Sequence, residues 1–264
     1  MTLLDIARNT GDRRAGIWLI NPVAKLAASA VLAMGLVLTI DPVSPLVVLA
    51  LLAPLIPWCG VPPLTLAVRL APIVLAAVLA GLTIVLYGTP SGDSHFRFLF
   101  MHVTDGSLAL GLATGLRILA LAAPSVVLFM TIDATDFADA LTQILRLPAR
   151  FVLSALGALR LAGLFLADWR TLEQARRARG LGDSGRIRRL LSQAFALFVL
   201  SIRRGTSLAT AMEARGFGPG MVRVPARVSV FGRTDAAFVL LFAAVTAAAV
   251  TAAILSGQWR WLFA

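Results

Sequence analysis

The chain has 264 residues, of which 59% are hydrophobic and only 14% are charged, and its mean hydropathy is +0.87. A soluble domain is about half apolar and about a quarter charged, so this composition excludes an ordinary soluble protein and predicts a membrane protein. The net charge of +11 favours a basic face beside anionic lipid. Binding to nucleic acid is disfavoured, because the aromatic residues are mostly Phe within apolar runs and are not interleaved with the arginines.

Five apolar runs predict membrane spans. Each span needs about 20 residues to cross the hydrocarbon core, so the two shortest runs must include flanking residues. In chain order the runs are Leu26–Ile40, Pro45–Pro57, Leu70–Tyr87, Ser107–Ile132 and Phe238–Leu255.

Basic residues orient these spans. Arg8, Arg13, Arg14 and Lys25 precede the first run, which places the N-terminus inside. Between Asp133 and Asp235 there are 16 arginines and 8 acidic residues, a net charge of +8, so this region is also expected inside. Five spans then leave the C-terminus outside. No apolar stretch precedes the first arginines, and we expect no cleavable signal peptide.

The apolar stretch Phe151–Ala167 resembles a further span, but its sequence argues against one. Arg160 would lie at its centre, at a cost of about 2.5–3.5 kcal/mol. A crossing here would also place outside the arginines that follow, Arg176, Arg177 and Arg179. We therefore expect a long helix on or near the inner membrane face, and Leu190–Ile202 has the same character.

The predicted fold class is an all-α polytopic membrane protein with about five transmembrane helices and long cytoplasmic helices between the fourth and the last span. Three parts are expected: a membrane domain of four spans over residues 1–132, a cytoplasmic helical domain over 133–235, and a C-terminal transmembrane helix over 236–264. The location that follows is the cell (plasma or inner) membrane, with the N-terminus and the long helices in the cytoplasm.

Several polar residues within or next to the spans have more than one interpretation. Arg117 lies about ten residues into the fourth run. In one interpretation, Arg117 faces a protein partner within the membrane. In the other, which is favoured, the span starts later and the Arg117 side chain reaches outward to the membrane surface. Asp133 or Asp136 is expected to cap the helix that follows the fourth span. Pro72 and Pro124 are either kinks or prolines that the spans simply tolerate.

Few residues suit metal or redox chemistry. Cys59 is the only cysteine, so no disulfide within the chain is possible. His95 and His102 are spaced to share one face of a helix, but they have little carboxylate support, and no metal site or other cofactor is expected.

The most specific feature of the sequence is a repeated helix ending. Residues 175–182 read ARRARGLG and residues 211–218 read AMEARGFG, so both fit the pattern A-x-x-A-R-G-[LF]-G. Gly180 and Gly216 suit the position just past a helix end, where a positive φ favours glycine. Arg179 and Arg215 fall at the last helical position, where a cation complements the helix dipole. Two ordinary helix caps remain one interpretation; the duplication favours the other, in which a soluble partner binds both ends.

The stretch Thr131–Gly182, followed by AMEARGFG, resembles the T component of energy-coupling factor transporters, importers of vitamins and metal ions in the ABC superfamily. The resemblance covers most of the chain, most specifically Thr131–Gly218. In that family the T subunit is a membrane scaffold with long coupling helices that end in Ala-Arg-Gly motifs.

The resemblance implies partners and site residues. The implied partners are two ABC-type ATPase subunits, a membrane-embedded substrate-binding S component and membrane lipid. Arg179 and Arg215 would dock on the ATPases, with supporting roles for Arg176, Glu213 and Phe217. The motif positions implied to share this role are Ala178, Arg179, Gly180, Ala214, Arg215 and Gly216.

No catalytic residue is predicted. Lys25 is the only lysine and follows Ala24, so no G-K-[ST] phosphate loop exists.

Two alternatives to a transport scaffold remain. One is a membrane-embedded enzyme acting on a lipid-linked or phosphorylated substrate, for which Asp168 and Glu173 are the candidate acids. The other is a structural protein that binds anionic lipid. The substrate of a transporter is not encoded in these features.

Overall fold

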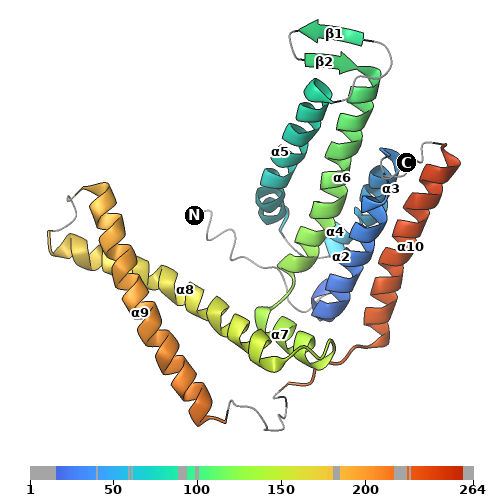
Figure 1. The fold of residues 1–264 in the computed structure, drawn as a ribbon. Helices are drawn as coiled ribbons and strands as arrows, with labels where there is room; N and C mark the ends of the chain where they lie inside the picture. The colour runs from blue at the N-terminus through green and yellow to red at the C-terminus, as the bar shows by residue number, and fades with distance from the viewer. Residues whose placement is uncertain are drawn as a thin grey trace. The chain divides into compact units, whose positions relative to one another are not determined.

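The structure is a computed structural model that describes residues 16–39, 41–58, 60, 62–88, 94–98, 101–180, 185–216, 225 and 227–257. The chain forms two compact units (Figure 1). The first comprises Met1–Ala140 and Ser229–Ala264, and the second comprises Leu141–Val228.

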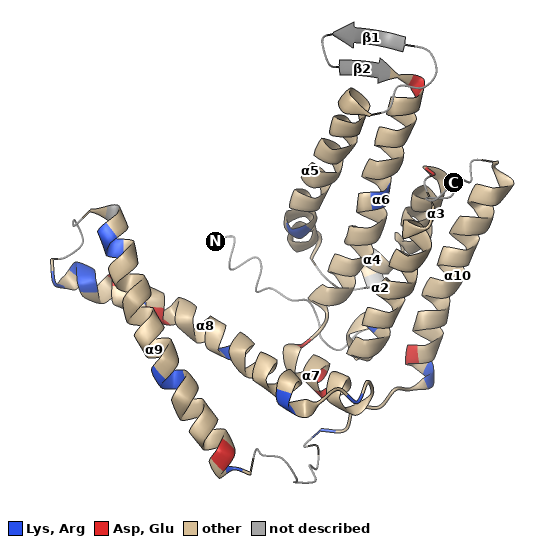
Figure 2. Cartoon of the chain, in the orientation of Figure 1, with Lys and Arg blue, Asp and Glu red and all other residues tan. Residues whose placement is uncertain are grey.

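The first unit is a bundle of apolar helices. A short 3-10 helix, η1 (Gly16–Leu19), comes first. The bundle helices are α2 (Pro22–Val37), α3 (Val43–Leu52), α4 (Leu55–Trp58), α5 (Pro63–Tyr87), α6 (Asp105–Met130) and α10 (Arg233–Leu255). The long helices α5, α6 and α10 show almost no charged residues along their length (Figure 2). The predicted fold class, an all-α polytopic membrane protein, is confirmed.

Not every predicted span is one membrane-crossing helix. α5, α6 and α10 are long and apolar enough to cross, whereas α2 and α3 are shorter apolar helices of 16 and 10 residues. The second predicted span, Pro45–Pro57, is divided into α3 and α4 on either side of Pro54, because proline cannot donate the backbone hydrogen bond that continues a helix. Pro72 and Pro124, by contrast, lie inside continuous helices.

The core of this unit lies where α2, α3, α6 and α10 meet. Its side chains are aliphatic or aromatic and fully or almost fully buried, among them Leu32, Val48, Leu128 and Phe242. The rings of Phe238 and Phe242 pack at 4.9 Å between centroids. Large apolar side chains elsewhere in the unit are exposed, as expected for a surface that lipid covers.

Glycines bring α5 and α6 into close contact. A Cβ atom added at Gly111 would lie 2.6 Å from the carbonyl oxygen of Gly81 and 2.5 Å from a methyl carbon of Val85. Gly115 approaches the carbonyl of Ala77 in the same way. Small residues four apart on both helices therefore allow the two backbones to touch, which is a common way of packing helices in membranes.

Two short strands precede α6. β1 (Ser94–Phe98) pairs antiparallel with β2 (Met101–Thr104), with Arg97 opposite His102. His95 and His102 therefore belong to a hairpin and do not share a helix face. Among the residues that the structure describes, no group of three or more His, Cys, Asp or Glu side chains is placed to hold a metal ion.

A buried polar node joins the starts of α2 and α10. The Asp235 carboxylate accepts hydrogen bonds from the backbone N–H of Asn21 at 2.7 Å and of Gly232 at 2.8 Å. The Asn21 side chain accepts from Val23 N–H and donates to the Ser229 hydroxyl and the Val230 carbonyl. Asn21 and Asp235 thus cap both helices and hold the segment that leads back into α10.

The second unit contains two long helices, α8 (Ala149–Ala178) and α9 (Arg186–Ala214). They follow α7 (Ala134–Gln143), which Asp133 caps by accepting a hydrogen bond from Thr135 N–H at 2.8 Å, as predicted. The helices predicted from Phe151–Ala167 and Leu190–Ile202 are present and extend well beyond those apolar stretches. By length and composition alone, α8 also qualifies as a candidate span.

Candidate functional site: the ends of α8 and α9

Both repeated sequences end their helices in the same way. Arg179 is the C-cap of α8, with φ −89° and ψ 7°, and Arg215 is the C-cap of α9, with φ −87° and ψ 11°. Gly180 and Gly216 follow with φ of 71° and 77°, a conformation that side chains other than glycine rarely adopt. The glycine caps are confirmed, and each arginine lies one position later than predicted, after the last helical residues Ala178 and Ala214.

The two arginines are exposed. Both are accessible to solvent at the helix ends, and within the described residues neither side chain makes a hydrogen bond or ion pair. The neighbouring Glu213 is also exposed, whereas Phe217, proposed as part of the second motif, lies outside the described residues. An exposed guanidinium on a rigid helix end retains its full set of donors for a carboxylate on another protein.

The motifs lie at opposite ends of α9. The end of α8 runs beside the first turns of α9, because Arg176 donates to the Ser192 hydroxyl at 2.9 Å and Glu173 pairs with Arg189 at 3.4 Å. Arg215 follows the last residue of α9, which is 29 residues long, or about 43 Å at the α-helical rise. The structure therefore presents two separate contact points and does not combine the arginines into one site.

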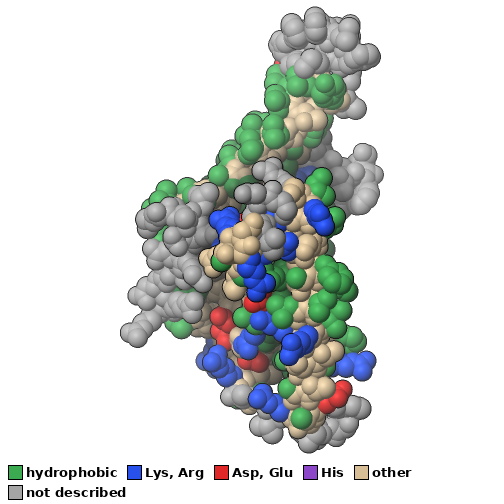
Figure 3. All heavy atoms as spheres, turned by 90° about the vertical axis from the view of Figure 1, so that its left-hand side faces the viewer, with side chains coloured by type: hydrophobic (Ala, Val, Ile, Leu, Met, Phe, Trp, Pro, Cys, Tyr) green, Lys and Arg blue, Asp and Glu red, His purple; other side chains and the backbone are tan. Residues whose placement is uncertain are grey.

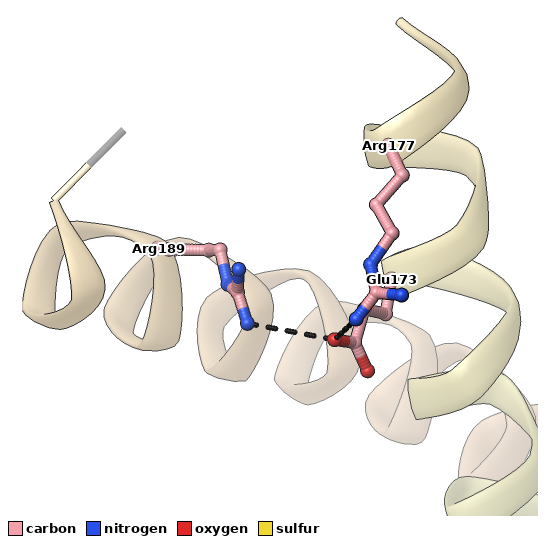
Figure 4. Close-up of polar contacts among 3 residues, drawn as sticks. All are labelled: Glu173, Arg177 and Arg189. Atoms are coloured by element: carbon pink, nitrogen blue, oxygen red, sulfur yellow. Dashed lines mark hydrogen bonds and ion pairs between the residues drawn. The ribbon is translucent and has the colours of Figure 1, made fainter. Parts of the chain in front are cut away.

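The two helices are tied together by carboxylates on α8 and arginines on α9. Glu173 accepts from Arg177 of its own helix at 2.7 Å and from Arg189 of α9 at 3.4 Å (Figure 4). Asp168 pairs with Arg204 through both carboxylate oxygens. The pairs between the helices could not be predicted from the sequence, since Glu173 and Arg189 are 16 positions apart and Asp168 and Arg204 are 36 apart. These side chains meet only when the hairpin of helices forms.

These pairs weaken the enzyme alternative. Asp168 and Glu173 were its only candidate acids, and both carboxylates are neutralised by arginines and bridge two helices. A catalytic acid or base needs a proton-accepting atom that reaches a substrate, and these oxygens already serve structural contacts.

The helix α9 faces α8 with its polar side and turns its apolar side away. Its contacts to α8 come from Arg189, Ser192 and Arg204, and Gln193 on the same side is 2% exposed. At 100° per residue, the opposite side carries a stripe of large apolar side chains, each more than half exposed. We call these residues the α9 stripe: Ile187, Leu191, Phe195, Phe198 and Ile202. The face of the molecule that Figure 3 shows carries basic side chains among exposed apolar side chains.

The fold and these helix ends define a polytopic helical membrane protein with a separate, basic helical unit. Over residues 17–225 the chain matches the CbiQ family, described as cobalt transport protein, and it belongs to that family. The predicted resemblance to the T component of energy-coupling factor transporters is confirmed by the relatives that follow.

Several relatives carry the name energy-coupling factor transporter transmembrane protein EcfT, among them the following two. The protein of Limosilactobacillus fermentum is 28% identical over 192 residues, which are 67% of this chain and 67% of the relative. The protein of Exiguobacterium sibiricum is 26% identical over 169 residues, 60% of this chain and 64% of the relative. The match thus spans slightly less than two thirds of the length of the Exiguobacterium protein.

Proposed function

We propose that this chain is the scaffold subunit of an energy-coupling factor importer, and that two ABC-type ATPase subunits dock on the ends of α8 and α9. The observation that carries the proposal is the pair of identically built helix ends. Each presents an exposed arginine on a glycine-terminated helix. Two ATPase subunits need two equivalent contacts, and one chain supplies both.

In this proposal each helix end enters a groove on one ATPase. Arg179 and Arg215 offer planar guanidinium groups to carboxylates in those grooves, where bidentate hydrogen bonds give both affinity and orientation. Gly180 and Gly216 follow the arginines directly with a positive φ, so each guanidinium would be presented at a helix end. Arg176 fixes the end of α8 on α9 through Ser192, and it thereby positions the first contact point.

The α9 stripe supports the second partner, a membrane-embedded S component. A helix that packs its polar side on α8 and exposes its apolar side leaves that surface to be covered in the working complex. A protein that is itself embedded in the membrane, or the bilayer, matches this apolar character. The S component would select the substrate, a vitamin or a metal ion, and the family description makes Co²⁺ the first substrate to test.

The proposed orientation places α8 and α9 in the cytoplasm, where ATP is available, with the segment after α10 outside. The net charge of +8 over residues 133–235 supports it. The chain itself would supply no catalytic group, and ATP hydrolysis would belong to the partner subunits.

Co-purification with the ATPases tests this function. Arg179→Glu and Arg215→Glu should each insert normally, because loss of a cap interaction costs only about 0.3–1 kcal/mol. Facing a carboxylate in a docking groove, each change should cost about 2–5 kcal/mol, or roughly 30- to 5,000-fold in affinity. The measurements are recovery of co-expressed ATPase subunits on the tagged chain, and ATP hydrolysis by the complex at matched membrane levels.

Arg203→Glu is the matched control, since Arg203 is also an exposed arginine of α9 but lies away from both motifs. It should retain the ATPases. If the two motif variants retain them equally well, the repeated endings are helix caps and the docking proposal is wrong.

A further inference from the structure

The membrane unit holds an arginine on the buried side of α6. Arg117 falls in register with Ala113, Ala120, Pro124 and Leu128, which form the side of α6 that packs into the bundle. α6 begins at Asp105, twelve residues before Arg117, so Arg117 lies well inside this helix. Arg117 is partly buried, and its Nη2 atom is buried with no hydrogen-bond partner in the described part of the chain.

A carboxylate of opposite charge lies near it. Asp41, in the turn between α2 and α3, is 1% exposed, and its charge acts on Arg117, although no ion pair or hydrogen bond joins the two side chains in the described part of the chain. Its Oδ2 atom accepts from Ser44 N–H at 2.6 Å and so caps α3, whereas its Oδ1 atom is buried without a partner among the described residues. Burying either charge alone inside a membrane is costly, and each therefore needs the other.

The register of the helices supports this pairing independently. α2 and α6 run antiparallel in the bundle (Figure 1). Near the start of α2, the Lys25 ammonium donates to the Thr131 carbonyl at 3.0 Å and to its hydroxyl at 2.9 Å. From this contact, α6 runs back 14 residues to Arg117, which is about 21 Å at the α-helical rise. α2 runs on 12 residues to its end at Val37, about 18 Å, and Asp41 lies four residues further on, in the turn. The antiparallel arrangement thus brings the turn that holds Asp41 near the level of Arg117.

We propose that Asp41 and Arg117 form an intramembrane charge pair that fixes α2 and its turn against α6. Together with the Lys25–Thr131 contact, it attaches the α2 segment to α6 at two polar points, one near each end of the α2 segment. α6 leads through Thr131 and Asp133 directly into α7, so its position sets where the chain leaves the membrane unit. The inference concerns the chain alone and does not depend on ATPase docking.

Charge-neutral variants test the pair. Asp41→Asn keeps a side-chain oxygen that can cap α3 through Ser44 N–H and removes only the charge. Arg117→Met removes the other charge and retains most of the volume. Each single variant leaves one unpaired buried charge and should lower the thermal unfolding midpoint of the purified chain by about 5–15 °C. The double variant Asp41→Asn/Arg117→Met removes both charges and should recover most of that loss.

A distance measurement tests whether the charge pair positions α2 against α6 as well as stabilising the fold. With Cys59 replaced by Ser, spin labels at Met34 on α2 and Leu112 on α6 occupy exposed sites. Their distance distribution should be narrow in the parent chain, broad in each single variant, and narrow again in the double variant. Arg117→Lys, which keeps the charge, should remain close to the parent.

Two results would overturn the proposal. One is additive loss of stability in the double variant, which would show that the two charges do not interact. The other is an unchanged distance distribution in Arg117→Met. If a single variant does not insert at all, recovery of insertion by the double variant supports the pair, and failure of that recovery refutes it.

Discussion

The ion pair between Asp168 of α8 and Arg204 of α9 is expected to hold the two proposed docking ends at a fixed separation. The Asp168 and Arg204 side chains are 21% and 34% exposed, and both carboxylate oxygens accept hydrogen bonds. At an effective dielectric constant of about 20, two charges about 4 Å apart attract by about 4 kcal/mol. Solvent screening and side-chain entropy reduce this, so we expect a net contribution of about 1–2 kcal/mol, above that of an ordinary surface pair because the contact is bidentate.

Asp168→Asn should therefore loosen the pair of helices without unfolding either one. A loss of about 1.4 kcal/mol raises the population of separated arrangements roughly tenfold. Spin labels at Ala155 on α8 and Thr210 on α9 should show a broader distance distribution. In a double-mutant cycle with Arg204→Met, the coupling energy should be about 1–2 kcal/mol. Since simultaneous docking at both ends depends on their separation, retention of the ATPase pair should fall by about 3- to 10-fold.

Arg177→Met is the matched control. Arg177 pairs with Glu173 of its own helix, is 67% exposed, and does not link the two helices. Its loss should cost only about 0.3–0.5 kcal/mol and leave the distance distribution unchanged. If Asp168→Asn behaves like this control, the Asp168–Arg204 pair does not set the arrangement of α8 and α9.

Two further predictions follow from the node at the start of α10 and from the charge distribution. Asp235→Ala removes the acceptor for one buried and one partly buried backbone N–H group, and it should lower the free energy of unfolding by about 3–5 kcal/mol, measured by denaturation of the purified chain. Asp235→Asn should lose about half as much, and equal losses would contradict the proposed capping. Reporter fusions after Gly180 and after Gly216 should be cytoplasmic, and a fusion after Leu255 should be external, because the excess of basic residues lies between Asp133 and Asp235. An external reporter at either motif would contradict the proposed orientation.

The composition and apolar runs of the sequence were enough to predict the class of this protein. Burial in lipid imposes a strong local requirement, since some 20 consecutive apolar residues must satisfy their backbone hydrogen bonds within a helix. α5, α6 and α10 could be recognised for that reason. The ends of α8 and α9 could also be predicted, because a glycine after an arginine at a helix end is a local signal that needs no tertiary contact.

The tertiary structure alone decided which polar residues meet. Asp168 and Arg204 are 36 positions apart, Asn21 and Asp235 are 214 apart, and Lys25 and Thr131 are 106 apart. From the sequence alone, Asp168 was a candidate catalytic acid and Arg117 had two interpretations, since nothing local distinguishes a charge with a distant partner from a charge without one. An ion pair in a low-dielectric interior depends on distance in space, and helix packing sets that distance, so the partners of buried charges in this protein follow from the way its helices pack.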